Sequence, residues 1–200
     1  MPAVIRLLLV RHGQSTWNAS GRWQGQADPP LSDLGRHQAR VAADALGTPD
    51  VIVASDLERA NHTALILSEA LGVGPVVIEP GLRERDAGEW AGLTRDEIEE
   101  AWPGYLADRR RPPGFEDEAA IVGRALEAIG RIHAEYDGGQ IVAVTHGGVV
   151  FALERHLGVE APGKLPNLAG RQVVVDGDRI RLDDRIVLVD HENLTVPGQI

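Results

Sequence analysis

An arginine and a histidine stand together directly after an apolar segment near the start of the chain. Arg11-His12-Gly13 follows residues 5–10, whose apolar pattern predicts a buried strand. In α/β folds, ligands bind outside the carboxyl ends of the strands. A fixed guanidinium binds phosphate oxygens, and a nitrogen of a neutral imidazole can attack phosphorus. The pair therefore predicts a site for a phosphorylated substrate at the end of this strand.

A second histidine and a second arginine occupy similar places farther along the chain. His146 follows the fourth expected strand, and Arg59 lies in the helix expected after the second strand. If these strands are neighbours, both side chains converge with the first pair on one edge of the sheet. Gly147 and Gly148 precede a helix, so their backbone N–H groups could also face an anion. Two arginines with backbone donors can bind a phosphoryl group and stabilise its transition state.

Such a pocket also needs a proton donor for the leaving oxygen, and the segment 82–90 offers one. Glu84 lies there between Arg83 and Arg85. A carboxyl group beside a phosphate dianion keeps its proton more readily, because like charges disfavour ionisation. Glu84 could therefore protonate the leaving group and later take a proton from water. The alternative is that Glu84 pairs with a flanking arginine on the surface.

Alternating apolar strands and helical patterns must position these residues. The expected strands are residues 5–10, 51–54, 76–78 and 141–144, followed by a hairpin of 173–175 and 180–182. Helices are expected from Ser32 to about Leu46, from Ser55 to Leu71, after a capping box of Thr94 and Glu97, over 117–136, and from about 148 to 157. Pro112-Pro113 makes 109–114 a loop. The alternation predicts an α/β fold, a single three-layer domain over 1–200 with a mainly parallel sheet, helices on both faces and an antiparallel edge hairpin.

Composition limits the partners and the setting. The 200 residues are 43% hydrophobic and 25% charged, which is typical of a globular domain with a full core. The net charge of -10 argues against nucleic acid and anionic membranes as partners. The lack of cysteine excludes disulfides and thiolate metal sites. No basic leader and no apolar run long enough to cross a bilayer is visible, so we expect a cytoplasmic protein.

Several short motifs occur in a fixed order from about residue 5 to residue 158. They are Leu9 to Asn18, Gln24-Gly25 through Ser32 and Gly35, Ser55 to Ala60 with Thr63-Ala64, Leu82-Arg83-Glu84 with Gly88 and Trp90, and Thr145 to Gly148. In order and spacing they resemble the histidine phosphatase superfamily, the phosphoglycerate mutase-like group. The resemblance implies the phosphoglycerate mutase-like α/β fold.

The resemblance also implies a role for each matched residue. His12 would be the nucleophile that becomes phosphohistidine, and Glu84 the general acid and then the base. The expected phosphate pocket is formed by Arg11, Arg59 and His146. The expected substrate-binding set adds Asn18, Gln24, Gly25 and Gly147. No metal and no cofactor is implied.

The segment around the acid distinguishes two branches of this superfamily. Mutases are usually longer and carry asparagine before the acid, whereas Leu82-Arg83-Glu84 here is similar to the phosphatase branch. We therefore expect hydrolysis of phosphomonoesters, because the shorter chains have a more open pocket that admits water. The chain departs from the phosphatases at Phe115-Glu116-Asp117, where they often show Gly-Glu-Ser. Distal substrate contacts are therefore not carried over.

Several alternatives stay open. The chain could be a bisphosphoglycerate-dependent phosphoglycerate mutase, or a non-catalytic module that binds phosphorylated ligands. His12 and His146 could instead hold a metal with a carboxylate, and Arg59 could pair with Glu58 or Glu69. The expected partner is a small phosphorylated metabolite, although its identity is open and phosphoprotein is a further candidate. A homodimer through the terminal hairpin is also open.

Three further features have a structural and a functional interpretation. The four tryptophans are expected to pack loops around the site or to form an apolar wall for the substrate. The run 109–111 of three arginines is expected to be solvated, or to attract polyanionic substrates to the mouth of the site. The tail from Asp190 to Asn193 could fold toward the pocket.

Overall fold

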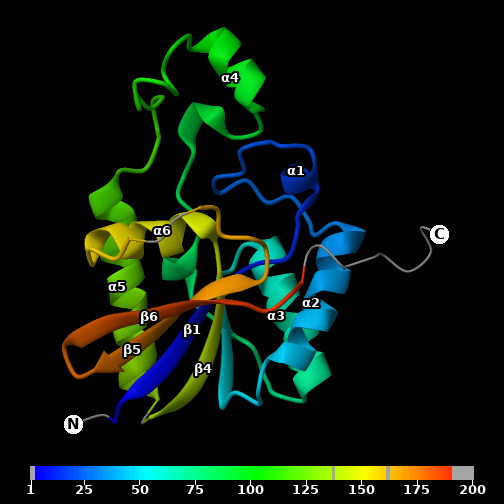
Figure 1. Cartoon of the computed structure of the whole chain (residues 1–200), viewed down its shortest axis with the longest axis vertical. Helices are drawn as coiled ribbons and strands as arrows, with labels where there is room; N and C mark the ends of the chain where they lie inside the picture. Colours follow the sequence, from blue (N-terminus) through cyan, green and yellow to red (C-terminus); the bar gives the residue numbers. More distant parts are fainter. Residues whose placement is uncertain (1–2, 137, 161–162, 191–200) are drawn as a thin grey trace.

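A computed structural model describes residues 3–136, 138–160 and 163–190. Within them, six strands form one sheet in the order β3-β2-β4-β1-β5-β6 (Figure 1). The strands are β1 (Ile5–Arg11), β2 (Val51–Ala54), β3 (Val77–Ile78), β4 (Gly139–Thr145), β5 (Ala169–Asp176) and β6 (Arg179–Val187). The first four are parallel, β5 pairs antiparallel with β1, and β6 pairs antiparallel with β5. The predicted α/β fold with an antiparallel edge hairpin is confirmed.

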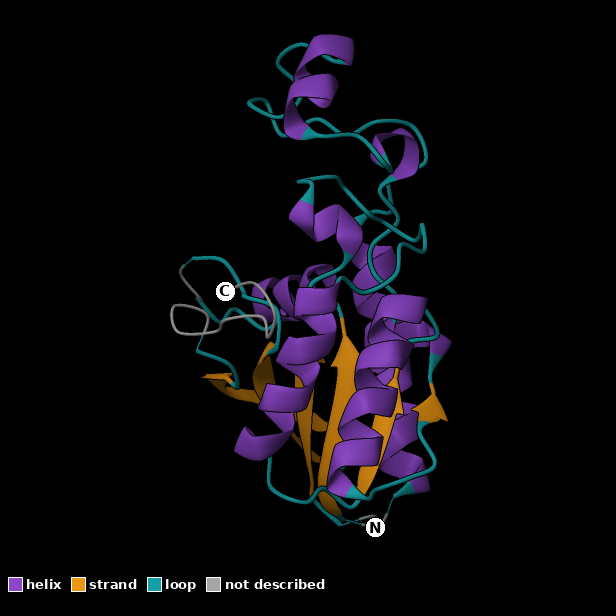
Figure 2. Cartoon of the chain, turned by 90° about the vertical axis from the view of Figure 1, so that its right-hand side faces the viewer, coloured by secondary structure: helices purple, strands orange, loops and turns teal. Residues whose placement is uncertain are grey.

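Helices cover both faces of this sheet (Figures 1 and 2). Helices α2 (Asp33–Ala45) and α3 (Glu58–Leu71) pack on one face, and α5 (Glu118–Glu135) and α6 (Gly147–His156) pack on the other. The near-continuous apolar sequence of β1 follows from this, since successive side chains point to opposite faces. Leu8 belongs to the core under α2 and α3, and Leu7 to the core under α5 and α6.

Helix starts are explained by side-chain caps at three of the predicted places. Ser32 caps α2, Asp117 caps α5, and Thr94 with Glu97 forms the capping box of α4 (Arg95–Ala101). The prediction that Ser55 opens α3 is wrong, because α3 begins at Glu58. The Ser55 hydroxyl instead lies 3.0 Å from the ring of His146, so it is engaged at the strand ends.

Other boundaries differ by a few residues. Strand β4 begins at Gly139, two residues before the expected start at residue 141, and Asp137 lies outside the described residues. A short helix that the sequence analysis did not predict, α1 (Thr16–Ala19), is capped by Ser15. The expectation for the tail concerns residues 190–193, of which 191–193 also lie outside the described residues.

The segment between β3 and α5 extends beyond the carboxyl ends of the strands (Figure 2). It contains two 3-10 helices, η1 (Pro80–Leu82) and η2 (Gly88–Trp90), and the helix α4. Its own apolar cluster surrounds Trp90, with Trp23, Trp102 and Phe115 packed against it. Three of the tryptophans therefore stabilise the extension next to the strand ends, as the packing interpretation predicted. No helix in the described ranges is long and apolar enough to cross a membrane.

A buried group of charges ties α6 to the edge hairpin. The Glu154 carboxylate is 2% exposed and accepts hydrogen bonds from Arg171 of β5 and from Arg185 of β6. The distances from Glu154 Oε1 to Nε of each arginine are 2.8 Å. Such a pair need not stabilise a fold more than apolar residues would, but removing one partner leaves buried charge uncompensated.

We predict that Glu154→Gln lowers the free energy of unfolding by about 3–5 kcal/mol, because two largely buried guanidinium groups then lose the carboxylate that they share. Urea unfolding monitored by tryptophan fluorescence measures this change. Glu127→Gln on α5 is the matched control, since its side chain is 76% exposed and 3.9 Å from Arg131; its effect should stay within about 0.5 kcal/mol. Equal losses in the two variants would contradict a structural role for the Glu154 group.

Candidate active site

The parallel pairing of β1 with β4 brings two histidines together. Arg11 is in register with Thr145, so His12 and His146 follow neighbouring strands at the same edge. The backbone N–H of His12 donates a hydrogen bond to the carbonyl of Thr145 at 3.0 Å. The two rings lie 5.1 Å apart between centroids and are almost fully buried. The predicted convergence at the strand ends is therefore present.

The hydrogen bonds of His12 select one tautomer. Its Nδ1 lies 2.6 Å from the carbonyl oxygen of Gly13, which can only accept, so Nδ1 carries the ring proton. The lone pair is then on Nε2, which faces the guanidinium Nε of Arg59 at 3.3 Å. Burial, followed by the charges of Arg59 and Arg11, holds the pKa of His12 well below its usual value. The imidazole is therefore neutral at physiological pH, as a nucleophile must be.

The two predicted phosphate-binding arginines are held by backbone carbonyls. Arg59 is completely buried and donates to the carbonyls of Gly25 at 2.8 Å and Ala27 at 2.7 Å. Arg11 donates to the carbonyl of Leu165 at 2.6 Å. Burial lowers the pKa of Arg59 to about 10 against the opposing effect of the Glu84 carboxylate, so it stays charged near neutrality. The alternative pairing of Arg59 with Glu58 or Glu69 is not what the structure shows.

His146 presents an unused polar atom. Its Nε2 lies 3.0 Å from Ser55 Oγ, while its buried Nδ1 has no hydrogen-bond partner among the described residues. Ser55 Oγ accepts the N–H of Leu57 and can donate its proton to Nε2; in the tautomer that uses this bond, the ring proton is on Nδ1. Burial and then Arg59 keep the pKa of His146 well below its usual value. A buried N–H without an acceptor is costly, and an anionic ligand oxygen would satisfy it.

The Glu84 carboxylate is held by backbone groups. It accepts the N–H of Arg85 at 2.7 Å and that of Gly148 at 3.2 Å. Arg83 pairs with Asp56, and Arg85 with Glu118, so the flanking arginines are engaged elsewhere. Gly148 also makes room for the acid, since a Cβ there would lie 2.0 Å from Glu84 Oε1. The predicted anion-facing N–H of Gly148 thus faces this carboxylate.

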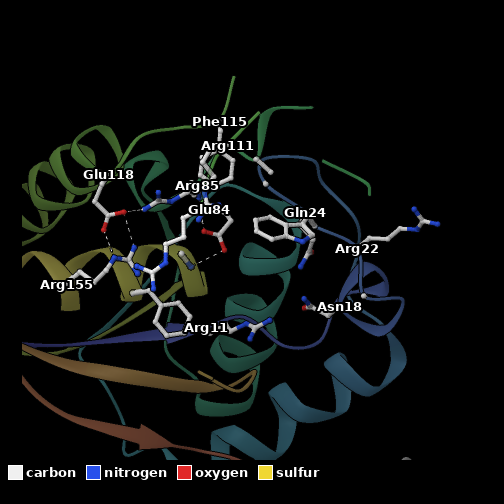
Figure 3. A pocket seen from close by; sticks show the side chains of 17 residues that line it. Arg11, Asn18, Arg22, Gln24, Glu84, Arg85, Arg111, Phe115, Glu118 and Arg155 are labelled. Carbon is white, nitrogen blue, oxygen red and sulfur yellow. Dashed lines mark hydrogen bonds and ion pairs between the residues drawn. The ribbon is translucent and has the colours of Figure 1, made fainter. Parts of the chain in front are cut away.

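A cavity of about 840 Å³ opens in front of these groups (Figure 3). Arg11, Asn18, Gln24, Gly25 and Glu84 line it, whereas His12, Arg59 and His146 are buried. The side-chain oxygen of Asn18 accepts the N–H of Ser15, and that of Gln24 accepts the Ser15 hydroxyl. The amide nitrogens of Asn18 and Gln24 are the remaining donors, which suits an anionic ligand.

Two predicted glycines and two missed residues complete the inner site. Gly25 has φ +51° and supplies the carbonyl that holds Arg59. Gly147 begins α6 and packs near Arg11 rather than lining the cavity. Sequence reasoning missed Asn167, whose amide nitrogen donates to the His12 carbonyl at 2.9 Å, and Arg124 of α5 behind the Glu84 loop. Both lie outside the matched motifs and carry no pattern that could have identified them.

The outer wall of the cavity is rich in arginine. Arg85, Arg109, Arg111 and Arg155 line it, and the Glu118 carboxylate pairs with Arg85 and Arg155 (Figure 3). Arg111 lies 5.2 Å from the ring of Phe115, and burial and then the neighbouring arginines lower its pKa. The run 109–111 is therefore divided, because Arg109 and Arg111 line the cavity and Arg110 does not.

Arg110 is the member of the run 109–111 that turns away from this wall. It pairs with Asp108 at 3.1 Å and stacks on Tyr105 at 4.1 Å. The residues that the structure describes contain no cluster of three histidine, aspartate or glutamate side chains placed to hold a metal ion.

Comparison with known proteins agrees with this geometry. A family model of the histidine phosphatase superfamily (branch 1) matches residues 7–182. A glucosyl-3-phosphoglycerate phosphatase from Mycolicibacterium vanbaalenii is 41% identical over 75% of this chain and 72% of its own length. A metal-independent phosphoserine phosphatase from Arabidopsis thaliana is 37% identical over 82% of this chain and 74% of its own.

A solved structure shows the same similarity in three dimensions. It is a mycobacterial glucosyl-3-phosphoglycerate phosphatase in complex with VO3, which superposes with a TM-score of 0.78 at 36% identity. The match covers 91% of this chain and 98% of that one. The strand-end histidines, the two arginines beside them and the matched residues lead to one conclusion: this chain belongs to branch 1 of the histidine phosphatase superfamily.

Proposed function

We propose that residues 1–200 form one histidine phosphatase domain that hydrolyses small phosphomonoesters through a phosphohistidine at His12, with no metal or cofactor. The observation that carries this proposal is the hydrogen bond from His12 Nδ1 to the Gly13 carbonyl. It leaves a lone pair on Nε2 beside a buried cation. Relatives named as phosphatases support hydrolysis over the mutase alternative.

The first step transfers the phosphoryl group to the protein. His12 Nε2 attacks phosphorus and the bond to the leaving oxygen breaks, while Glu84 gives its proton to that oxygen. Arg11, Arg59 and the Nδ1–H of His146 bind the non-bridging oxygens and stabilise their charge in the transition state. The Gly13 carbonyl stabilises the cationic ring that forms, because it accepts the Nδ1 proton.

The second step returns the protein to its starting state. Water attacks the phosphorus of phosphohistidine while the Glu84 carboxylate takes the proton of that water. The nitrogen–phosphorus bond breaks, its electron pair returns to Nε2, and inorganic phosphate leaves. Glu84 is then protonated again, so no external reductant, oxidant or metal enters the balance.

The outer arginines support a substrate class, a small metabolite with a second anionic group. Arg109 and Arg111 line the wall without an ion pair to Glu118, and their charges would attract that group. The relatives named above are a glucosyl-3-phosphoglycerate phosphatase and a phosphoserine phosphatase, and both of those compounds contain a carboxylate. A cytoplasmic location and a homodimer remain predictions from the sequence.

We predict that His12→Ala abolishes phosphatase turnover and that the native chain, quenched in alkali during turnover, carries one phosphoryl group at position 12. Intact-mass and peptide analysis detects the adduct, and circular dichroism checks that the variant is folded. A folded His12→Ala protein with substantial turnover, or a phosphoryl group found elsewhere, would contradict the proposed nucleophile.

We predict that Arg111→Met raises KM for O-phosphoserine about tenfold or more, equivalent to about 1.4 kcal/mol. The KM for phenyl phosphate, which has no second anionic group, should stay nearly unchanged. Methionine keeps the apolar contact with Phe115 and removes only the charge. Arg110→Met is the matched control, since that arginine stacks on Tyr105 outside the cavity. Equal effects on the two substrates would rule out a subsite for a second anion.

We predict that acid destabilises the fold partly through the two buried histidines. Their native pKa values are lowered, so below pH 6.5 the unfolded chain binds protons that the native chain does not. The free energy of unfolding therefore decreases as the pH is lowered. Each histidine should contribute about 1.4 kcal/mol of loss between pH 7.5 and pH 5.5. Urea unfolding of His12→Asn and His146→Asn should show a correspondingly weaker pH dependence than the native chain. An unchanged dependence in both variants would contradict neutral burial.

A further inference from the structure

The loop that carries Glu84 is held from behind by one side chain of α5. Arg124 Nη1 donates to the carbonyls of Gly81 at 2.9 Å and Arg83 at 2.6 Å. Its Nη2 donates to the carbonyl of Glu84 itself at 3.0 Å. One guanidinium therefore fixes three backbone carbonyls within four residues, and the last of them belongs to the acid.

Glu116 extends this contact to the other side of Glu84. Its carboxylate receives Arg124 Nε at 2.7 Å and Nη2 at 2.8 Å. The same carboxylate accepts the N–H of Asp86 at 3.1 Å, and the Glu116 N–H donates to the carbonyl of Asp86 at 3.0 Å. The backbone is thus held both before and after the acid, by a pair whose side chains are 22% and 14% exposed.

We propose that Arg124, oriented by Glu116, is a positioning residue that sets the place of the Glu84 carboxyl against the leaving oxygen. This rests on the proposed role of Glu84 as the general acid. Among the described residues, the hydrogen bonds to the carboxylate come from two backbone N–H groups, one of them on the next residue of the same loop. A shift of about 1 Å at such a group costs large factors in rate, so the loop has to be held rigidly.

The chemistry of the contact requires arginine. The Arg124 fork uses Nε, Nη1 and Nη2 at once, for three carbonyls and one carboxylate. Lysine has a single nitrogen and cannot span these acceptors, although it keeps the charge. Arg124→Lys therefore removes the geometry and retains the cation.

A leaving-group comparison separates positioning of the acid from general stabilisation of the fold. An alkyl phosphate needs a proton on its leaving oxygen, whereas p-nitrophenolate leaves without one. The parameter kcat/KM reports the step that forms phosphohistidine, so it does not depend on the later hydrolysis step, in which Glu84 acts as the base. We expect Arg124→Lys to lower kcat/KM for O-phosphoserine about 10- to 100-fold, and kcat/KM for p-nitrophenyl phosphate by less than about threefold. The larger loss is part of the rate enhancement of about 10²–10⁴ that a general acid contributes.

Arg131→Lys is the matched control on the same helix. Arg131 forms a two-pronged pair with Glu79, which caps η1, but is not bonded to the Glu84 loop beyond it. This variant should lower kcat/KM equally for both substrates or leave both values unchanged. Glu116→Gln is the second test variant, because it keeps shape and weakens the hold on Arg124; we expect the same selectivity with a smaller loss. Urea unfolding establishes that each variant is folded at the assay temperature.

Each outcome decides between the two levels of the proposal. If Glu84→Gln itself shows no selectivity for the alkyl phosphate, the acid assignment under the proposed function fails. If Glu84→Gln is selective but folded Arg124→Lys affects both substrates equally, only the positioning role is overturned. If Arg124→Lys does not fold, Glu116→Gln gives the decision, and equal effects on both substrates then reject the role.

Discussion

The site depends on two cations, Arg11 and Arg59, that no carboxylate of the described residues contacts directly. Arg59 is fully buried and Arg11 is partly buried, and backbone carbonyls hold both. Buried charge of one sign is costly unless an anion compensates it. Burial, and after it these charges, lowers the pKa of both adjacent imidazoles, so the arrangement keeps the proposed nucleophile neutral and suits a phosphoryl group beside it.

The constraint also explains how the acid is placed. A carboxylate in direct contact with Arg11 or Arg59 would neutralise the pocket and occupy the position of the substrate. Glu84 instead interacts with both arginines through space, while backbone N–H groups and the loop behind it hold its carboxylate. The fold thus keeps the Glu84 carboxylate apart from the position that the phosphate of a substrate would occupy.

The sequence predicted those parts of the site that local pattern encodes. Apolar runs followed by His12 and His146 identified the strand ends, and pairing of β1 with β4 then required the two rings to meet. Ser55, Asn167 and Arg124 act across separations of 91, 155 and 40 residues in the chain. Isolated polar residues of this kind leave no periodic signal, and only the packed structure shows what they contact. Ser55 was even assigned to a helix cap, because a serine after a strand is typical of one.

The two regions of the cavity rest on different parts of the fold. The inner groups follow β1, β2 and β4, where parallel pairing and two packed cores fix the backbone. The outer arginines lie largely on the extension and on α6, and Arg111 rests on the small aromatic cluster around Trp90. Glu84 stands at the junction, since its loop leaves η1 beside the strand ends and continues into the extension. A loop shared by both regions would transmit every movement of the extension to the acid. The hydrogen bonds from Arg124 of α5 to this loop would oppose such movement, so the proposed acid can lie at this junction and still have a fixed position relative to the inner groups.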